Sequence, residues 1–160
     1  MRLVVLAICT LIAAPTHAAG LIWAGGQWAA IDRGASCEAG SRSIRIAEKG
    51  KVQAHSGFAF DRARNGQFFA QLSRPPRAGS TVVLTVGTQP FLLAARGDWA
   101  WSTNRAQESA IIAAARAGGG MRVESRDQGG GRFADRYLLE GAATAIDAAA
   151  ARCAGKMQRP

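Results

Sequence analysis

The sequence predicts a mainly β domain, arranged as a β-sandwich, with two helices in its C-terminal half. Two observations support this fold class. Short apolar or alternating segments recur from residue 28 to residue 140, and turn residues separate them at intervals of about ten residues. Two alanine-rich stretches with helical spacing come late in the chain, after residue 104. A chain of 160 residues is long enough to bury one core.

The first 19 residues have the composition of a secretory signal peptide. Arg2 supplies a short positive region, an apolar run of about a dozen residues follows, and Pro15 precedes small residues. We expect cleavage after Ala18 or Ala19, which leaves residues 20–160 as a single exported domain. The apolar run is too short to cross a bilayer and no second run reaches that length, so we predict no transmembrane span.

The N-terminal half of this domain is expected to form short strands joined by tight turns. The expected strands are 28–31, a segment around Cys37, 57–60 and 67–72. Asp32-Arg33-Gly34 is a turn signal after the first strand. Asn65-Gly66 favours a tight turn between the last two strands, which would form a hairpin.

The C-terminal half alternates apolar and polar residues in further short segments. The expected strands are 81–86, 91–95, 99–101, 121–124 and 132–140. We expect turns at Gly87-Thr88-Gln89-Pro90 and at Gly97-Asp98, and Gly141 ends the last strand.

Two helices are predicted among these strands. Asn104 is the expected N-cap of the first, with Gln107 three residues later, and Gly118-Gly119-Gly120 ends it. The second helix is expected over 142–154. Four of its residues share one face by their spacing: Ile146, Ala149, Ala150 and Cys153.

Without the signal peptide the chain has two cysteines, Cys37 and Cys153. In an exported protein an even pair of thiols most simply forms one disulfide, so we predict this bond. Two buried free thiols are the alternative.

The chain is strongly basic, with a formal net charge of +9 and 17 arginines against three lysines. Such a charge favours anionic partners, for example lipid head groups or cell-wall polymers, and export argues against nucleic acid. The arginines form no tight block in the sequence, and coding bias is an alternative explanation for them. The partner is therefore left open as an anionic envelope component or another envelope protein.

The sequence carries no recognisable catalytic constellation, so we predict a protein that is not an enzyme, with no catalytic residue, cofactor or metal site. His55 lies near Ser56 and Asp61 in the sequence only, and one histidine with two disulfide-bonded cysteines cannot form a zinc site. Asp98 and Asp135 could in principle act as a carboxylate pair in a hydrolase, which is the least favoured alternative.

Arg96-Gly97-Asp98 has the sequence of an adhesion tripeptide that some integrins bind. The composition alone predicts roughly 0.07 occurrences of it in a chain of this length. We therefore interpret Gly97-Asp98 as a turn that positions Trp99 and Trp101, and keep adhesion as the alternative.

The order of motifs from residue 78 onward resembles the invasion-associated locus B family of exported bacterial proteins. The resemblance rests on "AGSTVVLTVGTQPFLL", "GDWAW" and the stretch from Glu108 to Cys153, with Trp28 and "SCEAGSR" upstream. It implies an immunoglobulin-like β-sandwich and a link to host-cell entry, and it brings no enzymatic activity. The positions that match the family pattern, and for which we expect structural roles, are Trp28, Gly97, Asp98, Trp101, Asp135, Tyr137 and Gly141.

The favoured hypothesis is a non-enzymatic binding module of the cell envelope, tethered by Cys37–Cys153. We expect it in the periplasm, with the cell surface or the extracellular medium as alternatives. The second hypothesis is a surface adhesin that contacts host cells through Arg96-Gly97-Asp98 or a basic patch. In the favoured reading, Trp28, Trp99 and Trp101 are mainly core or edge residues.

Overall fold

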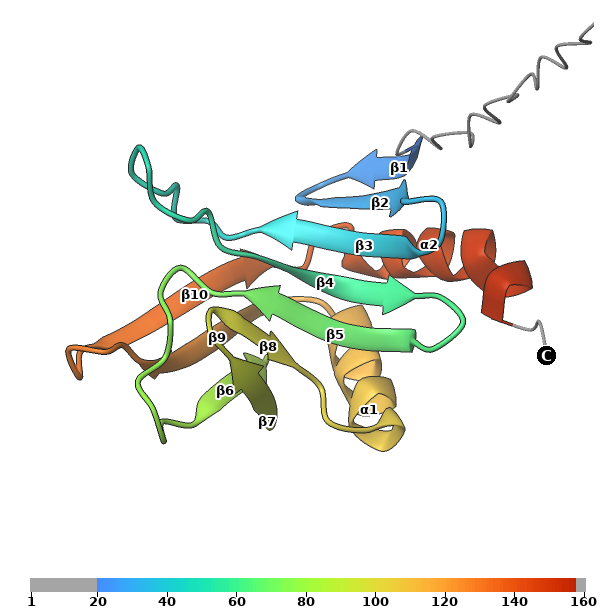
Figure 1. The fold of residues 1–160 in the computed structure, drawn as a ribbon. Coiled ribbons are helices and arrows are strands. Elements are labelled where there is room, and N and C mark those ends of the chain that lie inside the picture. Colours follow the sequence, from blue (N-terminus) through green and yellow to red (C-terminus); the bar gives the residue numbers. More distant parts are fainter. Residues whose placement is uncertain (1–19, 158–160) are drawn as a thin grey trace, which may run out of the picture.

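The computed structural model describes residues 20–157, which form ten strands and two helices (Figure 1). The strands are β1 Gly20–Gly25, β2 Trp28–Asp32, β3 Cys37–Arg42, β4 His55–Phe60, β5 Asn65–Gln71, β6 Val82–Val86, β7 Gln89–Arg96, β8 Trp99–Trp101, β9 Gly120–Arg126 and β10 Arg132–Leu138. The helices are α1 Arg105–Arg116 and α2 Ala142–Met157. The prediction of a mainly β chain with two late helices is confirmed. The predicted signal peptide, residues 1–19, lies outside the described residues.

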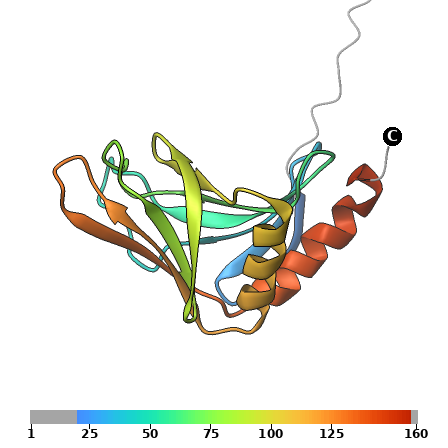
Figure 2. The same ribbon diagram turned by 90° about the horizontal axis from the view of Figure 1, so that it is seen from below.

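All strand pairs are antiparallel, in the order β1-β2-β3-β4-β5-β8-β7-β6-β9-β10. The strand β7 joins two layers, because residues 89–93 pair with β6 and residues 94–96 pair with β8. Figure 2 shows the layers inclined to each other, with α1 and α2 at one side of them. Helix α2 packs on β1 to β4, and α1 packs mainly on β5.

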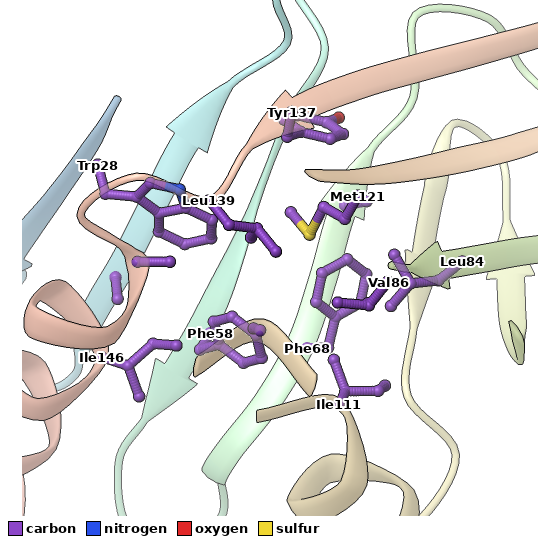
Figure 3. Close-up of a cluster of buried hydrophobic side chains, with 14 of the residues drawn as sticks. Trp28, Phe58, Phe68, Leu84, Val86, Ile111, Met121, Tyr137, Leu139 and Ile146 are labelled. Carbon is purple, nitrogen blue, oxygen red and sulfur yellow. The ribbon is translucent and has the colours of Figure 1, made fainter. Parts of the chain in front are cut away.

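The core lies between the two layers and the helices (Figure 3). The first layer contributes Trp28, Phe58 and Phe68, and their rings pack with centroids 6.0 and 5.6 Å apart. The indole nitrogen of Trp28 donates to the carbonyl of Leu138 at 2.8 Å, so this buried ring keeps its one polar atom bonded. The other layer and the helices complete the core with Leu84, Val86, Met121, Tyr137, Ile111 and Ile146.

Helix α2 is tied to the first layer by covalent and ionic contacts. The predicted disulfide between Cys37 and Cys153 is present, with Cα atoms 5.8 Å apart and both residues fully buried. Beside it, the carboxylate of Asp32 accepts from Arg152 at 2.9 Å and from Lys156 at 3.0 Å. The bond from Lys156 is the largest of the contacts that lower the pKa of Asp32 well below its usual value. We refer to α2 and the strands β1 to β3 beneath it as the anchored end.

Strand β1 was not expected from the sequence, because it is glycine-rich and directly follows the predicted signal peptide. Its hairpin with β2 packs against the start of α2, where the Gln27 amide donates to the Glu140 carbonyl at 3.1 Å. Gly141 has a φ of +89°, and a Cβ atom there would lie 2.2 Å from the carbonyl oxygen of Gly25. This close approach of two backbones requires glycine at position 141.

Two expected turns and one helix end differ from the prediction. Asn65 and Gly66 already belong to β5, and the turn before them is made by Asp61, whose carboxylate accepts from the amides of Ala63 and Arg64 at 2.8 Å. The turn after β6 is only Gly87-Thr88, so Pro90 lies inside β7. A proline is tolerated there because this part of β7 has only β6 as a neighbour. Helix α2 continues to Met157, three residues beyond the expected end.

Helix α1 begins at Arg105, and Asn104 is its N-cap as predicted. The side-chain oxygen of Asn104 accepts from the Gln107 amide at 2.9 Å. The side chain of Gln107 reaches back to the Thr103 amide at 2.7 Å, one residue before the position expected for a capping box.

Candidate ligand-binding site at the basic end

Three segments that are far apart in the sequence meet at the end of the molecule opposite the C-terminus of α2 (Figure 1). They are the end of β3 with the β3–β4 loop (42–54), the β5–β6 loop (73–80) and the β9–β10 turn with its flanking residues (126–132). We call these three segments together the basic end.

Direct contacts hold the three segments together. Pro76 forms an isolated β-bridge with Asp127, and the Ile44 amide donates to the Arg136 carbonyl of β10 at 2.8 Å. The guanidinium of Arg74 pairs with the carboxylate of Asp127 at 2.8 Å, and this bond lowers the pKa of Asp127 below its usual value. The basic end is therefore one connected surface.

The fold collects the excess positive charge at the basic end. Its segments hold eight cations against two carboxylates, whereas the rest of the described chain holds ten cations against nine carboxylates. The eight cations are Arg42, Arg45, Lys49, Lys51, Arg74, Arg77, Arg126 and Arg132. Cations that are scattered in the sequence are thus gathered at one end of the folded protein. The positive charge therefore points to a particular region of the surface.

A pocket of about 660 Å³ lies between the β3–β4 loop, residues 73–75 and β10. Arg45, Lys51 and Arg132 line it, and none of them forms an ion pair with another residue of 20–157. Ile46 and Phe133 give the pocket an apolar wall. Cations beside an apolar wall fit a ligand that combines anionic and apolar groups.

The side chain of Gln53 holds the β3–β4 loop in shape. Its oxygen accepts from the Ala47 amide at 2.8 Å, and its nitrogen donates to the Ser43 hydroxyl at 2.9 Å and to the Arg45 carbonyl at 3.2 Å. One amide group therefore bridges both sides of the loop. The backbone of the loop is therefore held in shape before any ligand arrives.

The floor of the pocket contains the buried carboxylate of Asp135 in β10. Burial raises the pKa of Asp135 above its usual value, although the carboxylate accepts a hydrogen bond from the Ser73 amide at 2.9 Å. Behind it the hydroxyl of Tyr137 is buried without a hydrogen-bond partner in the described chain, and burial is the main cause that raises the pKa of this phenol. Asp135 also fixes the β5–β6 loop against β10, so it joins two segments that form the pocket.

The sequence neighbours considered for catalysis are not brought together. His55 and Ser56 point to opposite faces of β4, and the carboxylate of Asp61 is bonded within its own turn. Asp98 and Asp135 do not share the pocket, since Asp98 is not among its lining residues.

The tripeptide Arg96-Gly97-Asp98 forms the hairpin turn between β7 and β8. Arg96 and Gly97 are exposed, and Gly97 has a φ of +62°. The carboxylate of Asp98 is half-buried and accepts from the side chain of Gln71 at 2.9 Å, while its carbonyl accepts from the Leu72 amide at 2.7 Å. The bonds that Asp98 accepts from Gln71 and Leu72 thus hold the turn against the end of β5.

Only one of the three tryptophans considered above is a core residue. Trp28 is 2% exposed, whereas Trp99 and Trp101 lie half-buried on the outer face of the first layer, on an interior strand. There Trp99 packs against His55 at 5.5 Å and Phe69 at 6.2 Å between ring centroids. The expectation of core or edge positions is therefore wrong for Trp99 and Trp101.

The described residues 20–157 contain no group of three or more His, Cys, Asp or Glu side chains placed to hold a metal ion. Within the same range, neither helix is long and apolar enough to cross a membrane.

Comparisons of the chain with protein-family models, curated proteins and solved structures gave no match. The resemblance to the invasion-associated locus B family therefore stays a prediction from the order of the motifs.

Sequence reasoning missed the residues that form this site, among them Arg45, Lys51, Gln53 and Arg132. One signal could have identified the loop. Ile44, Arg45 and Ile46 alternate apolar and basic residues, and Lys51-Val52 follows shortly after, which is unusual for a loop that only needs to be solvated. The contribution of residues 74 and 132 could not be found in the same way, because it depends on the fold.

Proposed function

We propose that the protein is an exported, non-enzymatic binding module of the bacterial cell envelope, of the invasion-associated locus B type, and that it binds an anionic ligand at the basic end. The observation that carries the proposal is the gathering of eight cations against two carboxylates in the three segments of the basic end. Four of these cations line one pocket: Arg45, Lys51, Arg74 and Arg132. A positive surface with low-dielectric walls concentrates anions and accelerates their association.

The charges at the pocket are available to a ligand. Arg45, Lys51 and Arg132 have no carboxylate partner among the described residues, so a ligand does not have to displace an existing ion pair. Arginine side chains also bind carboxylate and phosphate groups through two parallel hydrogen bonds. Both groups are common in bacterial envelope polymers and lipids.

The disulfide supports export. Such bonds form and persist in oxidising compartments such as the periplasm, and this one closes a loop of 116 residues. We place the protein in the periplasm, where anionic envelope components are within reach.

Binding is favoured over hydrolysis by the environment of the two carboxylates in the pocket. Asp135 is buried and bonded to the Ser73 amide, while Glu48 lies on the exposed β3–β4 loop. We therefore assign Asp135 a structural role, in which it joins Ser73 to β10, rather than a role as an acid or base.

Adhesion through Arg96-Gly97-Asp98 has less support than binding at the basic end. An adhesion loop must offer its aspartate to the receptor, whereas Asp98 is half-buried and bonded to Gln71.

The proposal is tested with two charge-reversal variants that change the net charge equally. One carries Arg45→Glu, Lys51→Glu and Arg132→Glu in the pocket. The other carries Arg62→Glu, Arg96→Glu and Arg105→Glu, three exposed arginines outside the basic end that form no ion pair in the described chain.

Binding of soluble inorganic polyphosphate to the oxidised protein is measured by calorimetry. We expect the pocket variant to bind at least tenfold more weakly than the wild type and the control variant to stay within about threefold, with binding that weakens as salt is added. Equal losses in both variants would mean that only the net charge matters, and the proposed site would be wrong.

A further inference from the structure

The basic end presents apolar side chains as well as charge. Six large hydrophobic residues are exposed in residues 20–157, and three of them lie on the β3–β4 loop. Ile46 is 77% exposed, Ile44 56% and Val52 40%. The other three, Leu21, Leu92 and Leu138, lie on three different strands. Single exposed hydrophobic residues are ordinary, whereas three on one loop need an explanation.

The three apolar side chains are exposed on a loop that extends past the ends of β3 and β4. Figure 1 shows the β3–β4 loop extending past the ends of β3 and β4, at the end of the molecule opposite the C-terminus of α2. The bonds of Gln53 to Ala47, Ser43 and Arg45 fix the loop in this shape. The exposed isoleucines are therefore presented to the outside and cannot simply fold back into the core.

Cations alternate with these apolar residues along the loop. Arg45 stands between Ile44 and Ile46, and Lys51 directly precedes Val52. The β5–β6 loop and the β9–β10 turn add arginines at the same end of the molecule (Figure 1). Exposed side chains of both kinds thus occupy the same loop, and further arginines lie at the same end of the molecule.

We infer that the basic end docks on the surface of an anionic phospholipid bilayer, with Ile44, Ile46 and Val52 inserted at the boundary between head groups and acyl chains. The inference rests on the proposed function and names the source of the anionic ligand. Apolar side chains reach a few ångströms into the interface, while Lys and Arg remain at the level of the lipid phosphates.

A bilayer fits this surface better than a soluble anionic polymer does. A polymer of carboxylates or phosphates would satisfy the cations and leave the three apolar side chains in water. A bilayer covers both kinds of side chain at once, because it places an anionic layer directly over an apolar one. The apolar wall of the pocket, formed with Phe133, continues this surface toward β10.

The test compares two sets of serine substitutions at exposed hydrophobic residues. The loop variant carries Ile44→Ser, Ile46→Ser and Val52→Ser, and the control carries Leu21→Ser and Leu92→Ser, which are 69% and 62% exposed elsewhere. All five side chains are exposed, so both variants are expected to fold, which circular dichroism and thiol titration verify.

Co-sedimentation is measured with vesicles of phosphatidylglycerol and, separately, of phosphatidylcholine, using the full oxidised protein. We expect the wild type and the control to bind phosphatidylglycerol vesicles at least tenfold more tightly than phosphatidylcholine vesicles. The loop variant should bind phosphatidylglycerol vesicles at least tenfold more weakly than the wild type, but soluble polyphosphate as well as the wild type does.

Each other outcome identifies which proposal fails. If the loop variant binds phosphatidylglycerol vesicles like the wild type, insertion of the apolar side chains is wrong and the cations alone explain binding, while the proposed function stands. Equal binding to both vesicle types would also overturn the inference. If the wild type binds neither vesicles nor polyphosphate, the proposed function itself fails.

Discussion

The side chains that hold the anchored end together are paired or buried, whereas many side chains at the basic end are exposed and unpaired within the described chain. At the anchored end Cys153 is bonded to Cys37, Asp32 pairs with two cations of α2, and Ile146 is 1% exposed. At the basic end Arg45 has no ionic partner in the described chain and Ile46 is 77% exposed.

This difference suggests that the anchored end stabilises the fold, whereas the basic end is available for binding. A loop that leaves charges unpaired and isoleucines in water contributes little to folding. The fold tolerates such a loop because the disulfide, helix α2 and the core stabilise the protein without it. Substitutions at the anchored end should therefore change stability but not binding, and substitutions at the basic end should change binding but not stability.

The largest effect is expected from removing the disulfide. With Cys37→Ser and Cys153→Ser, the free energy of unfolding should fall by about 4–5 kcal/mol, because the bond restricts an unfolded chain over 116 residues. Urea unfolding measures this loss. Polyphosphate binding by the molecules that remain folded should not change, and a loss of binding in folded protein would contradict the division between the two ends.

A matched pair of isoleucine substitutions compares the ends directly. Ile146→Ala removes a buried side chain and should lower the free energy of unfolding by about 2–5 kcal/mol. Ile46→Ala changes an exposed side chain, and the effect should stay within about 0.5 kcal/mol. Thermal unfolding of both variants gives the comparison, and a large destabilisation by Ile46→Ala would show that the loop is part of the core.

The last effect depends on pH and concerns Asp135, which lines the pocket and also joins β10 to the β5–β6 loop. Its pKa is raised in the folded state, so the folded protein binds a proton more readily than the unfolded chain. The wild type should lose stability relative to Asp135→Asn as the pH rises from below the ordinary value of 3.8 to above the raised pKa. Urea unfolding of both proteins across this pH range measures the difference, and the opposite slope would mean that the carboxylate is stabilised in its charged form.

Local patterns in the sequence explain most of the fold. The cap at Asn104, the spacing of Ile146 and Cys153 and the alternation through β6, β9 and β10 predict their elements, because each depends on residues close in the chain. Strand β1 was not predicted because its sequence, GLIWAG, does not alternate apolar and polar residues. Phe133, Asp135 and Tyr137 occupy alternate positions of β10. This spacing could also have predicted that Asp135 is buried on the inner face of the strand.

The site could not be predicted because it depends on which strands become neighbours. Lys51 and Arg132 line one pocket although 80 residues separate them in the sequence. Their proximity follows from the turn of the sheet at β7, which brings β10 back beneath the β3–β4 loop, and no local pattern records it.

Docking of the basic end on a membrane can be located residue by residue with amide shift mapping by nuclear magnetic resonance. The oxidised, isotope-labelled protein is titrated with bicelles that contain phosphatidylglycerol. The account predicts shifts or broadening in residues 42–54, 73–80 and 126–132, and unchanged signals in α2 and β1 to β3 apart from Arg42. Perturbations centred on α2 or on the outer aromatic face around Trp99, with an unchanged β3–β4 loop, would contradict it.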